Sequence, residues 1–308
     1  MSLETVNCYL CNSGKFKLLH HDPQSGCSIA KCTKCSSIYT RKRWKEDDLE
    51  KKYSNDSYYT QRCAASWTDL WLGSQKMELK YIERIAGIKG SLLDVGCGGG
   101  AFVSVARKCG WDAFGIDHSH SGITHAVEHW HLPQSSVICA DFMRYDFGMI
   151  FDVVTTFHVL EHIYYPLQFL SRVRNIIKED SLFVTAVPNF GSIDLKISPE
   201  LMKITVDLPF HVSHFTPESL TRLLHAGGFR VIKRKFFPSA YIMHPVQNVF
   251  RAIFKKTASN THTADSDTDT NSVSSRFSGI KSSVMSLLAV ISPANYMVYY
   301  CRPKRAKS

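Results

Sequence analysis

No part of the 308-residue chain contains the ~18 uninterrupted apolar residues that a membrane-spanning helix needs. The N-terminus also lacks the combination of a basic start, an apolar run and a cleavage site that marks a secretory signal peptide. Without such a signal, the ten cysteines favour free thiols and metal ligands over disulfide bonds. These absences predict a cytoplasmic protein.

Acidic residues are scarce in the last quarter of the chain. Residues 230–308 contain 13 basic side chains and only three acidic ones, whereas residues 1–229 contain 24 of each. The formal net charge of +10 therefore belongs to the C-terminal part, and such a local excess suggests an anionic partner. Apolar residues at helical spacing beside Arg251, Lys255 and Lys256 leave two alternatives. One is a helix lying on the anionic inner face of a membrane, and the other is a helix that packs on the core.

A glycine cluster follows a short apolar strand in the first third of the chain. Residues 91–95 have a strand pattern, and Gly96, Gly98 and Gly100 follow before the helical pattern of Ala101–Lys108. Glycine at such a turn lets the backbone approach a ligand closely because no Cβ is in the way. Strand–loop–helix units of this kind bind nucleotide-like ligands in open α/β folds. The pattern also satisfies the dinucleotide motif G-x-G-x-x-A, so an NAD-dependent enzyme is an alternative.

The central region alternates strands and helices, which is typical of a doubly wound parallel sheet and predicts an α/β fold. The predicted strands are Leu92–Val95, Ala113–Ile116, Val137–Cys139, Phe151–Thr156, Leu182–Val187 and Arg230–Phe236. The predicted helices are Ala101–Lys108, Ser121–His129, Pro166–Ile177 and Pro217–Ala226. A late aromatic and β-branched run, Tyr296–Cys301, predicts one more strand.

Acidic and aromatic residues stand where these strands end. Asp94 precedes the first glycine by two residues, and Asp117 ends the second strand, where a carboxylate can accept hydrogen bonds from ribose hydroxyls. Asp141 and Phe142 follow the third strand and offer an acceptor and an aromatic wall for adenine. Phe157 follows the fourth strand.

Together with the segment His158-Val159-Leu160-Glu161-His162, these motifs resemble the class I S-adenosylmethionine (SAM)-dependent methyltransferases over about residues 81–237 and the last strand. The resemblance implies a seven-stranded, mostly parallel Rossmann-like sheet whose last strand inserts antiparallel between the fifth and sixth. It implies SAM as the cofactor. The implied cofactor-binding residues are Asp94, Gly96, Gly98, Gly100, Asp117, Asp141, Phe142 and Phe157.

Histidines follow two neighbouring strands of this predicted sheet. His158 and His162 come after the fourth strand, and His211 and His214 come after the fifth strand and a loop. Because the carboxyl ends of parallel strands meet at one edge, the two groups can converge. A near-neutral pKa suits histidine for taking a proton from a hydroxyl acceptor. His158 is the leading candidate base, and His162 and His214 are further catalytic candidates. For His162, a hydrogen bond without catalysis is the alternative.

A metal ion near the acceptor is a second possibility that the resemblance implies. Similar ubiquinone-pathway and small-RNA methyltransferases carry an E-x-x-E-H segment that binds a divalent ion. Here His158 replaces the first glutamate, while Glu161 and His162 remain and His214 could complete the set. Losing a carboxylate makes Mg²⁺ less suitable than a softer metal.

The acceptor class is narrowed by two motifs that are missing after the fourth strand. The [DNS]-P-P-[YF] motif of amino-methylating nucleic-acid enzymes and the nucleophilic cysteine of cytosine C5 chemistry are both absent there. We therefore expect transfer to an oxygen or carbon of a small-molecule or lipid-linked acceptor, such as a sugar, quinone or phenol. Nucleic acid is disfavoured. The alternative is an RNA methyltransferase that holds RNA through its N-terminal cysteine module and basic C-terminal part.

Two Cys-x-x-Cys pairs near the N-terminus, Cys8/Cys11 and Cys32/Cys35, are separated by 20 residues. This spacing indicates a four-thiolate structural zinc site in a small ribbon-like module. Cys27 lies between the pairs and is expected to be spare. The alternative is four reduced cysteines in a small lobe.

The sequence therefore predicts five parts. They are a zinc-ribbon-like module (1–43), a helical linker or lid (44–90), a SAM-binding core (91–240), a helical insertion (241–295) and a last strand with a basic tail (296–308). Residues 257–275 of the insertion are rich in Ser, Thr, Asp and Asn and are expected to be disordered. In the linker, Tyr58 and Tyr59 either form part of a lid or only pack the module onto the core.

Overall fold

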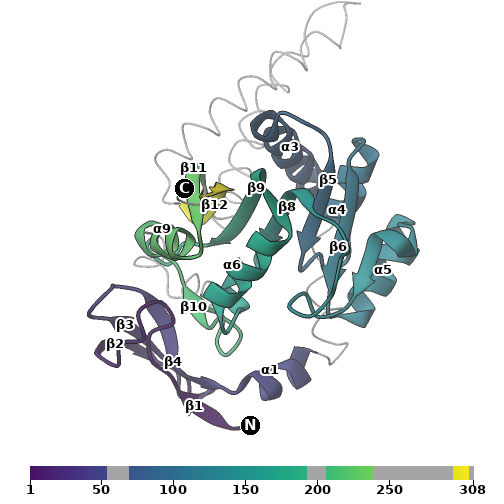
Figure 1. The fold of residues 1–308 in the computed structure, drawn as a ribbon. Coiled ribbons are helices and arrows are strands. Elements are labelled where there is room, and N and C mark those ends of the chain that lie inside the picture. Colours follow the sequence, from purple (N-terminus) through teal and green to yellow (C-terminus); the bar gives the residue numbers. More distant parts are fainter. Residues whose placement is uncertain (54–68, 193–205, 239–293, 305–308) are drawn as a thin grey trace, which may run out of the picture.

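The computed structural model describes residues 1–53, 69–192, 206–238 and 294–304 (Figure 1). Tyr58 and Tyr59, residues 241–293 of the predicted insertion and its expected disordered stretch 257–275 lie outside the described residues. Among the residues that are described, no helix combines the length and apolar character that crossing a membrane requires.

A seven-stranded sheet forms the centre of the molecule, in the order β11-β12-β9-β8-β5-β6-β7 (Figure 1). Its strands are β5 (Ser91–Val95), β6 (Asp112–Asp117), β7 (Val137–Cys139), β8 (Phe151–Phe157), β9 (Ile177–Pro188), β11 (Phe229–Pro238) and β12 (Ala294–Pro303). Strands β5 to β9 pair in parallel, while β12 is antiparallel to both β9 and β11. The predicted doubly wound sheet is confirmed, including the antiparallel insertion of the last strand.

Helices cover both faces of this sheet (Figure 1). They are α3 (Asp69–Ala86), α4 (Ala101–Lys108) and α5 (His120–Trp130) on one face, and α6 (Pro166–Asn175) and α9 (Pro217–Ala226) on the other. Successive strand residues point to opposite faces. Leu92 and Val153 accordingly pack with the first set of helices, and Leu93 and Val154 with the second. The strands are buried on both sides, which explains their continuous apolar runs.

The main error in the predicted boundaries lies between α6 and β9. The sequence predicted a helix to Ile177 and a strand from Leu182, but α6 ends at Asn175 and β9 begins at Ile177. Residues 178–180 of β9 are exposed and charged, so they do not show the apolar pattern of a buried strand. Ile177 pairs with Phe151 of β8, and this pairing extends the strand beyond its apolar part.

The N-terminal module contains a second sheet, in the order β1-β4-β3-β2. Its strands are β1 (Leu3–Thr5), β2 (Phe16–His21), β3 (Ser28–Cys32) and β4 (Ile38–Trp44), followed by helix α1 (Glu46–Tyr53). A fifth strand, β10 (Ser213–His214), pairs with β4, although it lies far along the chain. The sequence predicted a helical linker from residue 44. In the structure, residue 44 is the last residue of β4, and the first helix begins at Glu46.

Side-chain contacts add to this connection between the N-terminal module and later segments of the chain. The ring of Tyr9 meets the rings of Tyr39 and Phe215 edge-on, with centroids 6.3 and 6.4 Å away. The hydroxyl of Tyr164 donates to the carbonyl of Trp44 at 2.8 Å. The N-terminal module is therefore packed against the segment that carries His211 and His214.

Candidate functional site

The glycine loop between β5 and α4 has no room for a side chain at Gly96 or Gly100. Gly96 has φ 70°, and a Cβ there would lie 2.5 Å from Cγ2 of Val159. Gly100 has φ 74°, and its Cβ would lie 2.6 Å from Cβ of Ala126. Gly98 has φ 51°, which is also in the left-handed region that favours glycine. The loop is thus held from two sides, by the residue after His158 and by α5.

Asp117 lies beside this loop, at the end of β6. Its Oδ2 accepts a hydrogen bond from the Gly98 amide at 2.8 Å, and its Oδ1 accepts one from the Ser119 amide at 2.8 Å. The structure therefore brings the predicted ribose-binding carboxylate to the predicted cofactor loop.

Asp94 ends β5 below the same loop and is only 4% exposed. Its Oδ1 accepts a hydrogen bond of 2.6 Å from the Thr155 hydroxyl. Burial raises the pKa of Asp94 to about 7; the Thr155 hydrogen bond opposes this rise and the nearby Asp117 adds to it. A cationic ligand beside Asp94 would favour its ionised form.

The other predicted cofactor residues differ in their exposure and in their contacts. Asp141 is half exposed, accepts from the Met143 amide at 2.8 Å and forms a 3.3 Å ion pair with Arg144. Phe142 is buried, and its ring packs on that of Phe169 at 5.1 Å, so it belongs to the core. Phe157 meets Phe102 edge-on at 4.9 Å. The contacts of Asp141 and Phe142 with adenine, and of Phe157 with the cofactor, remain predictions.

His158 stands at the carboxyl end of β8, next to the residue that packs on Gly96. Its φ of 57° is unusual for a residue with a side chain. The side chain is 53% exposed, and its Nδ1 lies 3.4 Å from Oε1 of Glu161, which is buried. A short 3₁₀ turn, η2 (Leu160–His162), positions this carboxylate behind the histidine. The exposed imidazole therefore lies beside the cofactor loop with a carboxylate against one ring nitrogen.

Glu161 is a buried carboxylate among histidines. Burial alone would raise its pKa, but His158, His162 and His211 together hold the pKa below its usual value. Among the described residues, neither of its carboxylate oxygens has a hydrogen-bond partner, and the contact with His158 is electrostatic. An ionised carboxylate in this environment needs a nearby positive charge or a proton donor.

His162 and His214 are buried more deeply than His158. A ring nitrogen of His162 lies 3.1 Å from the Phe210 carbonyl, and Nε2 of His214 lies 3.0 Å from the Thr40 hydroxyl. Burial, together with the neighbouring His211, lowers the pKa of His162 to about 4 and that of His214 to about 3. Both imidazoles are therefore neutral at neutral pH and are weaker bases than a solvated histidine.

The structure brings the two predicted histidine groups together. The rings of His162 and His211 meet at 4.7 Å between centroids. Ligand atoms of Glu161, His162 and His211 all lie within 4.8 Å of one another, as a metal site requires. His214, which the sequence offered as the completing ligand, is not in this group, and His211 takes its place.

The sequence reasoning missed two residues that position the site. Thr40 donates to the His211 carbonyl at 2.8 Å and contacts the ring of His214, and Val159 occupies the space above Gly96. Neither carries a sequence signal, because one is a threonine in a strand and the other an apolar residue in a loop. Their roles depend on contacts between distant segments.

The four cysteines of the N-terminal pairs converge as predicted. The sulfur atoms of Cys8 and Cys35 lie 3.4 Å apart, those of Cys11 and Cys32 lie 3.6 Å apart, and all four lie within 4.8 Å. A tetrahedral zinc ion with ~2.3 Å bonds places its sulfur ligands ~3.8 Å apart. The arrangement fits such an ion. Cys27 is buried and lies outside the group.

Comparisons with known proteins agree with this geometry. A family described as "Methyltransferase domain" matches residues 74–234. The ubiquinone biosynthesis O-methyltransferase of Coxiella burnetii is 29% identical over 189 residues, which cover 56% of this chain and 76% of that protein. The protein of the same name from Ruegeria is 26% identical over 176 residues, covering 54% and 69%.

Two solved structures share the fold. One is a SAM-dependent methyltransferase from Archaeoglobus fulgidus, with a TM-score of 0.51, 20% identity and coverage of 80% of this chain and 99% of the other. The second is the 1,6-didemethyltoxoflavin-N1-methyltransferase of Burkholderia thailandensis, with a TM-score of 0.54, 13% identity and coverage of 94% and 100%. The latter was solved with its substrate and S-adenosylhomocysteine.

Proposed function

The chain belongs to the methyltransferase-domain family, and from this membership we propose that it moves a methyl group from SAM to an oxygen of a small acceptor, with His158 as the base. Its sequence relatives are named for O-methylation in ubiquinone biosynthesis. A phenol, a quinone precursor or a sugar is therefore the acceptor class that we infer. The observation that carries the proposal is the position of His158, beside the glycine loop and against Glu161.

The residues around the glycine loop fit the cofactor. A Cβ at Gly96 or Gly100 would collide with neighbouring side chains, so the loop can take this path only with glycine at these two positions. Asp117 offers carboxylate oxygens to ribose, and the buried Asp94 would gain from a cation. SAM supplies an electrophilic methyl group and a positive charge when it is bound.

His158 then has a defined task in the transfer. With Nδ1 facing Glu161, its Nε2 would accept the proton of the acceptor hydroxyl as the oxygen bonds to the methyl carbon. The sulfur–methyl bond would break at the same time, and S-adenosylhomocysteine would leave as a neutral thioether. Glu161 stabilises the imidazolium that forms, because a buried carboxylate with no hydrogen-bond donor among the described residues lies against that ring. A positioned base of this kind contributes about 10²–10⁴-fold to the rate. We assign His162 and His214 to holding the site as neutral imidazoles.

The proposal is tested by following radioactive methyl transfer from SAM to a panel of phenols, quinols, sugars and lipid-linked glycans. His158→Ala should lower kcat about 10²–10⁴-fold while leaving the affinity for S-adenosylhomocysteine unchanged, because only proton removal is lost. Glu161→Gln should lower kcat and shift its pH profile. His225→Gln, a change at the exposed end of α9, is the control and should behave like the unchanged protein.

Equal rates in His158→Ala and the unchanged protein would remove His158 from the chemistry. Transfer to amines but to no hydroxyl in the panel would overturn the assignment to oxygen. The RNA alternative gains no support from the names of the relatives, and strong salt-dependent RNA binding would be needed to revive it. Contact with an anionic membrane surface depends on residues 241–295 and remains a prediction.

The same cluster supports a second possibility, a divalent ion at Glu161, His162 and His211. The observation in its favour is the pair of Glu161 oxygens without hydrogen-bond partners among the described residues. One carboxylate and two imidazoles suit a metal of intermediate softness, such as Zn²⁺, better than Mg²⁺. Metal analysis of the purified protein and of His211→Asn tests it, since the variant should lose one ion per chain.

We also infer a structural zinc ion at Cys8, Cys11, Cys32 and Cys35. The four sulfur atoms are grouped at distances that fit a tetrahedral ion, and all four positions are taken by the protein. A closed site of this kind stabilises a small module and leaves no position for a substrate.

A further inference from the structure

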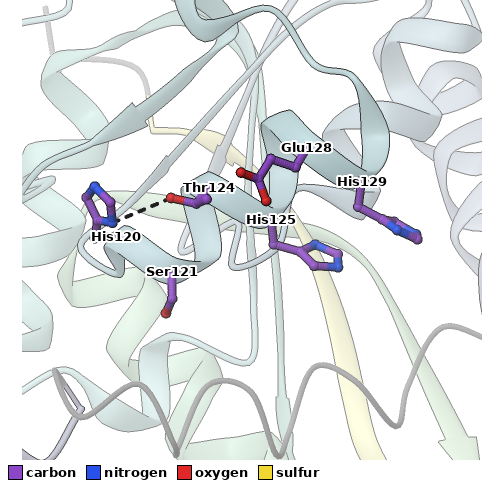
Figure 2. A pocket seen from close by; sticks show the side chains of 6 residues that line it. All are labelled: His120, Ser121, Thr124, His125, Glu128 and His129. Carbon is purple, nitrogen blue, oxygen red and sulfur yellow. Dashed lines mark hydrogen bonds between the residues drawn. The ribbon is translucent and has the colours of Figure 1, made fainter.

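The outer face of α5 carries a pair of histidines that the proposed methyl transfer does not use. His125 and His129 are four residues apart, and their rings stack with centroids 4.7 Å apart and planes inclined by 24°. Figure 2 shows both rings projecting from the same side of the helix. They lie at an open hollow of about 620 Å³ that is lined by His120, Ser121, Thr124, His125, Glu128 and His129.

The spacing of this pair along α5 suits a metal ion. Side chains at i and i+4 are neighbours on a helix surface, and two histidines at this spacing on one helix face are a known arrangement for zinc. Nδ1 of His125 lies 3.4 Å from the Gly99 carbonyl. Histidines that bind metals usually donate the other ring N–H to such an acceptor, which fixes the ring and directs Nε2 to the ion.

The chemistry of the hollow restricts which ion would bind. Two imidazoles suit Ni²⁺, Cu²⁺ or Zn²⁺, whereas Ca²⁺ and Mg²⁺ need a set of oxygen ligands. The exposed Glu128 adds negative charge to the same hollow. In the described residues, groups of three or more metal-ligating side chains occur only at the four cysteines and at Glu161, His162 and His211. The α5 pair therefore offers two protein ligands, and water completes the coordination.

We propose that His125 and His129 form a surface binding site for a divalent transition-metal ion. Because His125 contacts the Gly99 carbonyl, this site lies one hydrogen bond away from the loop assigned to the cofactor. The proposal does not depend on methyl transfer, since it rests on the geometry of α5 alone. A failure of the proposed function would leave it standing.

The test is calorimetric titration of the zinc-loaded full-length protein with NiCl₂. The unchanged protein should bind one Ni²⁺ that His129→Gln binds at least tenfold more weakly. His120→Gln is the matched control, because His120 lines the same hollow but has Thr124 rather than a histidine four residues later. Its Ni²⁺ affinity should stay within a factor of two of the unchanged protein.

Fluorescence gives a second measurement on the same three proteins. Trp130 meets His129 edge-on at 4.6 Å, so a paramagnetic ion held by His129 should quench part of the tryptophan emission. This quenching should disappear in His129→Gln and persist in His120→Gln. Equal Ni²⁺ binding and equal quenching in His129→Gln and the unchanged protein would overturn the proposal, because any bound ion would then be at another site.

Discussion

At the scale of single residues, Asp94 and Asp117 have opposite surroundings although both lie under one loop. Asp117 accepts two backbone hydrogen bonds. Asp94 has one hydrogen bond from a hydroxyl and is almost fully buried, which favours its protonated form. The two carboxylates are therefore expected to respond differently to substitution.

Asp117→Ala should weaken the binding of SAM. It removes a charged acceptor from ribose and leaves the amides of Gly98 and Ser119 without their partner. The loss of charge-assisted hydrogen bonds should cost about 1–3 kcal/mol of binding free energy. Calorimetry with S-adenosylhomocysteine measures this, with Asp112→Ala at the exposed start of the same strand as the control. Unchanged affinity in Asp117→Ala would refute the ribose assignment.

Asp94 should make SAM binding depend on pH. Its pKa is raised from 3.8 to about 7, so below pH 7 the cationic ligand must displace a proton from it. Affinity should therefore rise as the pH rises towards 7, and Asp94→Asn should bind more weakly with little pH dependence. Calorimetry in buffers of different ionisation enthalpy would detect the released proton. The same slope in Asp94→Asn would assign the proton to another group.

The raised pKa also affects the stability of the ligand-free protein. Between the unfolded pKa of 3.8 and the folded value of about 7, the folded state holds a proton that the unfolded state has lost. The contribution of Asp94 to the free energy of unfolding therefore decreases as the pH rises through this range. A bound cation favours the ionised form of Asp94 and therefore opposes this decrease in the free energy of unfolding.

At the scale of secondary-structure elements, β4 joins the N-terminal module to β10, a strand from much later in the chain. One of its edges pairs with β3, and the other is shared by β1, which covers Lys42 to Trp44, and β10, which covers Ile38 and Tyr39. The buried Thr40 lies at this second edge. Its amide donates to the Val212 carbonyl at 3.0 Å, and its hydroxyl reaches both His211 and His214.

Thr40→Val should destabilise the protein by about 1–3 kcal/mol, because the His211 carbonyl and the His214 ring lose a buried partner. Valine has nearly the same shape, so the change isolates the hydroxyl. Thr40→Ser keeps the hydroxyl and should recover most of the lost stability. Urea unfolding monitored by circular dichroism compares the three proteins. A Thr40→Val variant as stable as the unchanged protein would show that these contacts contribute nothing.

The elements that the sequence predicted well are those with a local signal. The glycine loop, the buried parallel strands and the α9 start at Thr216-Pro217 all have such a signal, and Thr216 does cap that helix. The start of β9 and the whole of β10 were missed. Both are defined by their partners, Phe151 and β4, and not by their own residues. Pairing between distant segments leaves no periodic pattern in a single strand.

At the scale of the whole molecule, we expect the cysteine module and the SAM-binding core to respond differently to substitutions. Asp94, Asp117 and the glycine loop belong to the strands of the seven-stranded sheet and the turn after β5, whereas β4 and the four cysteines belong to the N-terminal module. His211 and His214 lie where the two sheets meet. Disturbing the module should therefore affect the histidine cluster more than the cofactor loop.

Cys32→Ser should release the zinc ion and loosen the N-terminal module, while S-adenosylhomocysteine still binds with near-normal affinity. Metal analysis and calorimetry measure the two effects on one sample. Cys27→Ala is the matched control, since it alters a buried cysteine of the same module outside the ligand group and should keep the ion. Absence of zinc from the unchanged protein would end the assignment.

The candidate site was predicted in outline because its chemistry comes from motifs in a fixed order along the chain. Asp117 and the glycines meet as expected, and the histidine groups converge. Burial was the part that the sequence did not reveal. His158 is half exposed, whereas His214 is almost fully buried and contacts Thr40 of the N-terminal module. Only the assembled structure separates the exposed His158 from the buried His162 and His214.

The pairing of β4 with β10 also has a consequence for the synthesis of the chain on the ribosome. Thr40 and His211 are 171 residues apart, so the ribosome needs roughly 10–30 s to make the second partner after the first. During that interval, the part of β4 that β10 will cover presents an open strand edge. A nascent chain stalled before residue 213 would keep this edge exposed, and it would be a natural target for chaperones.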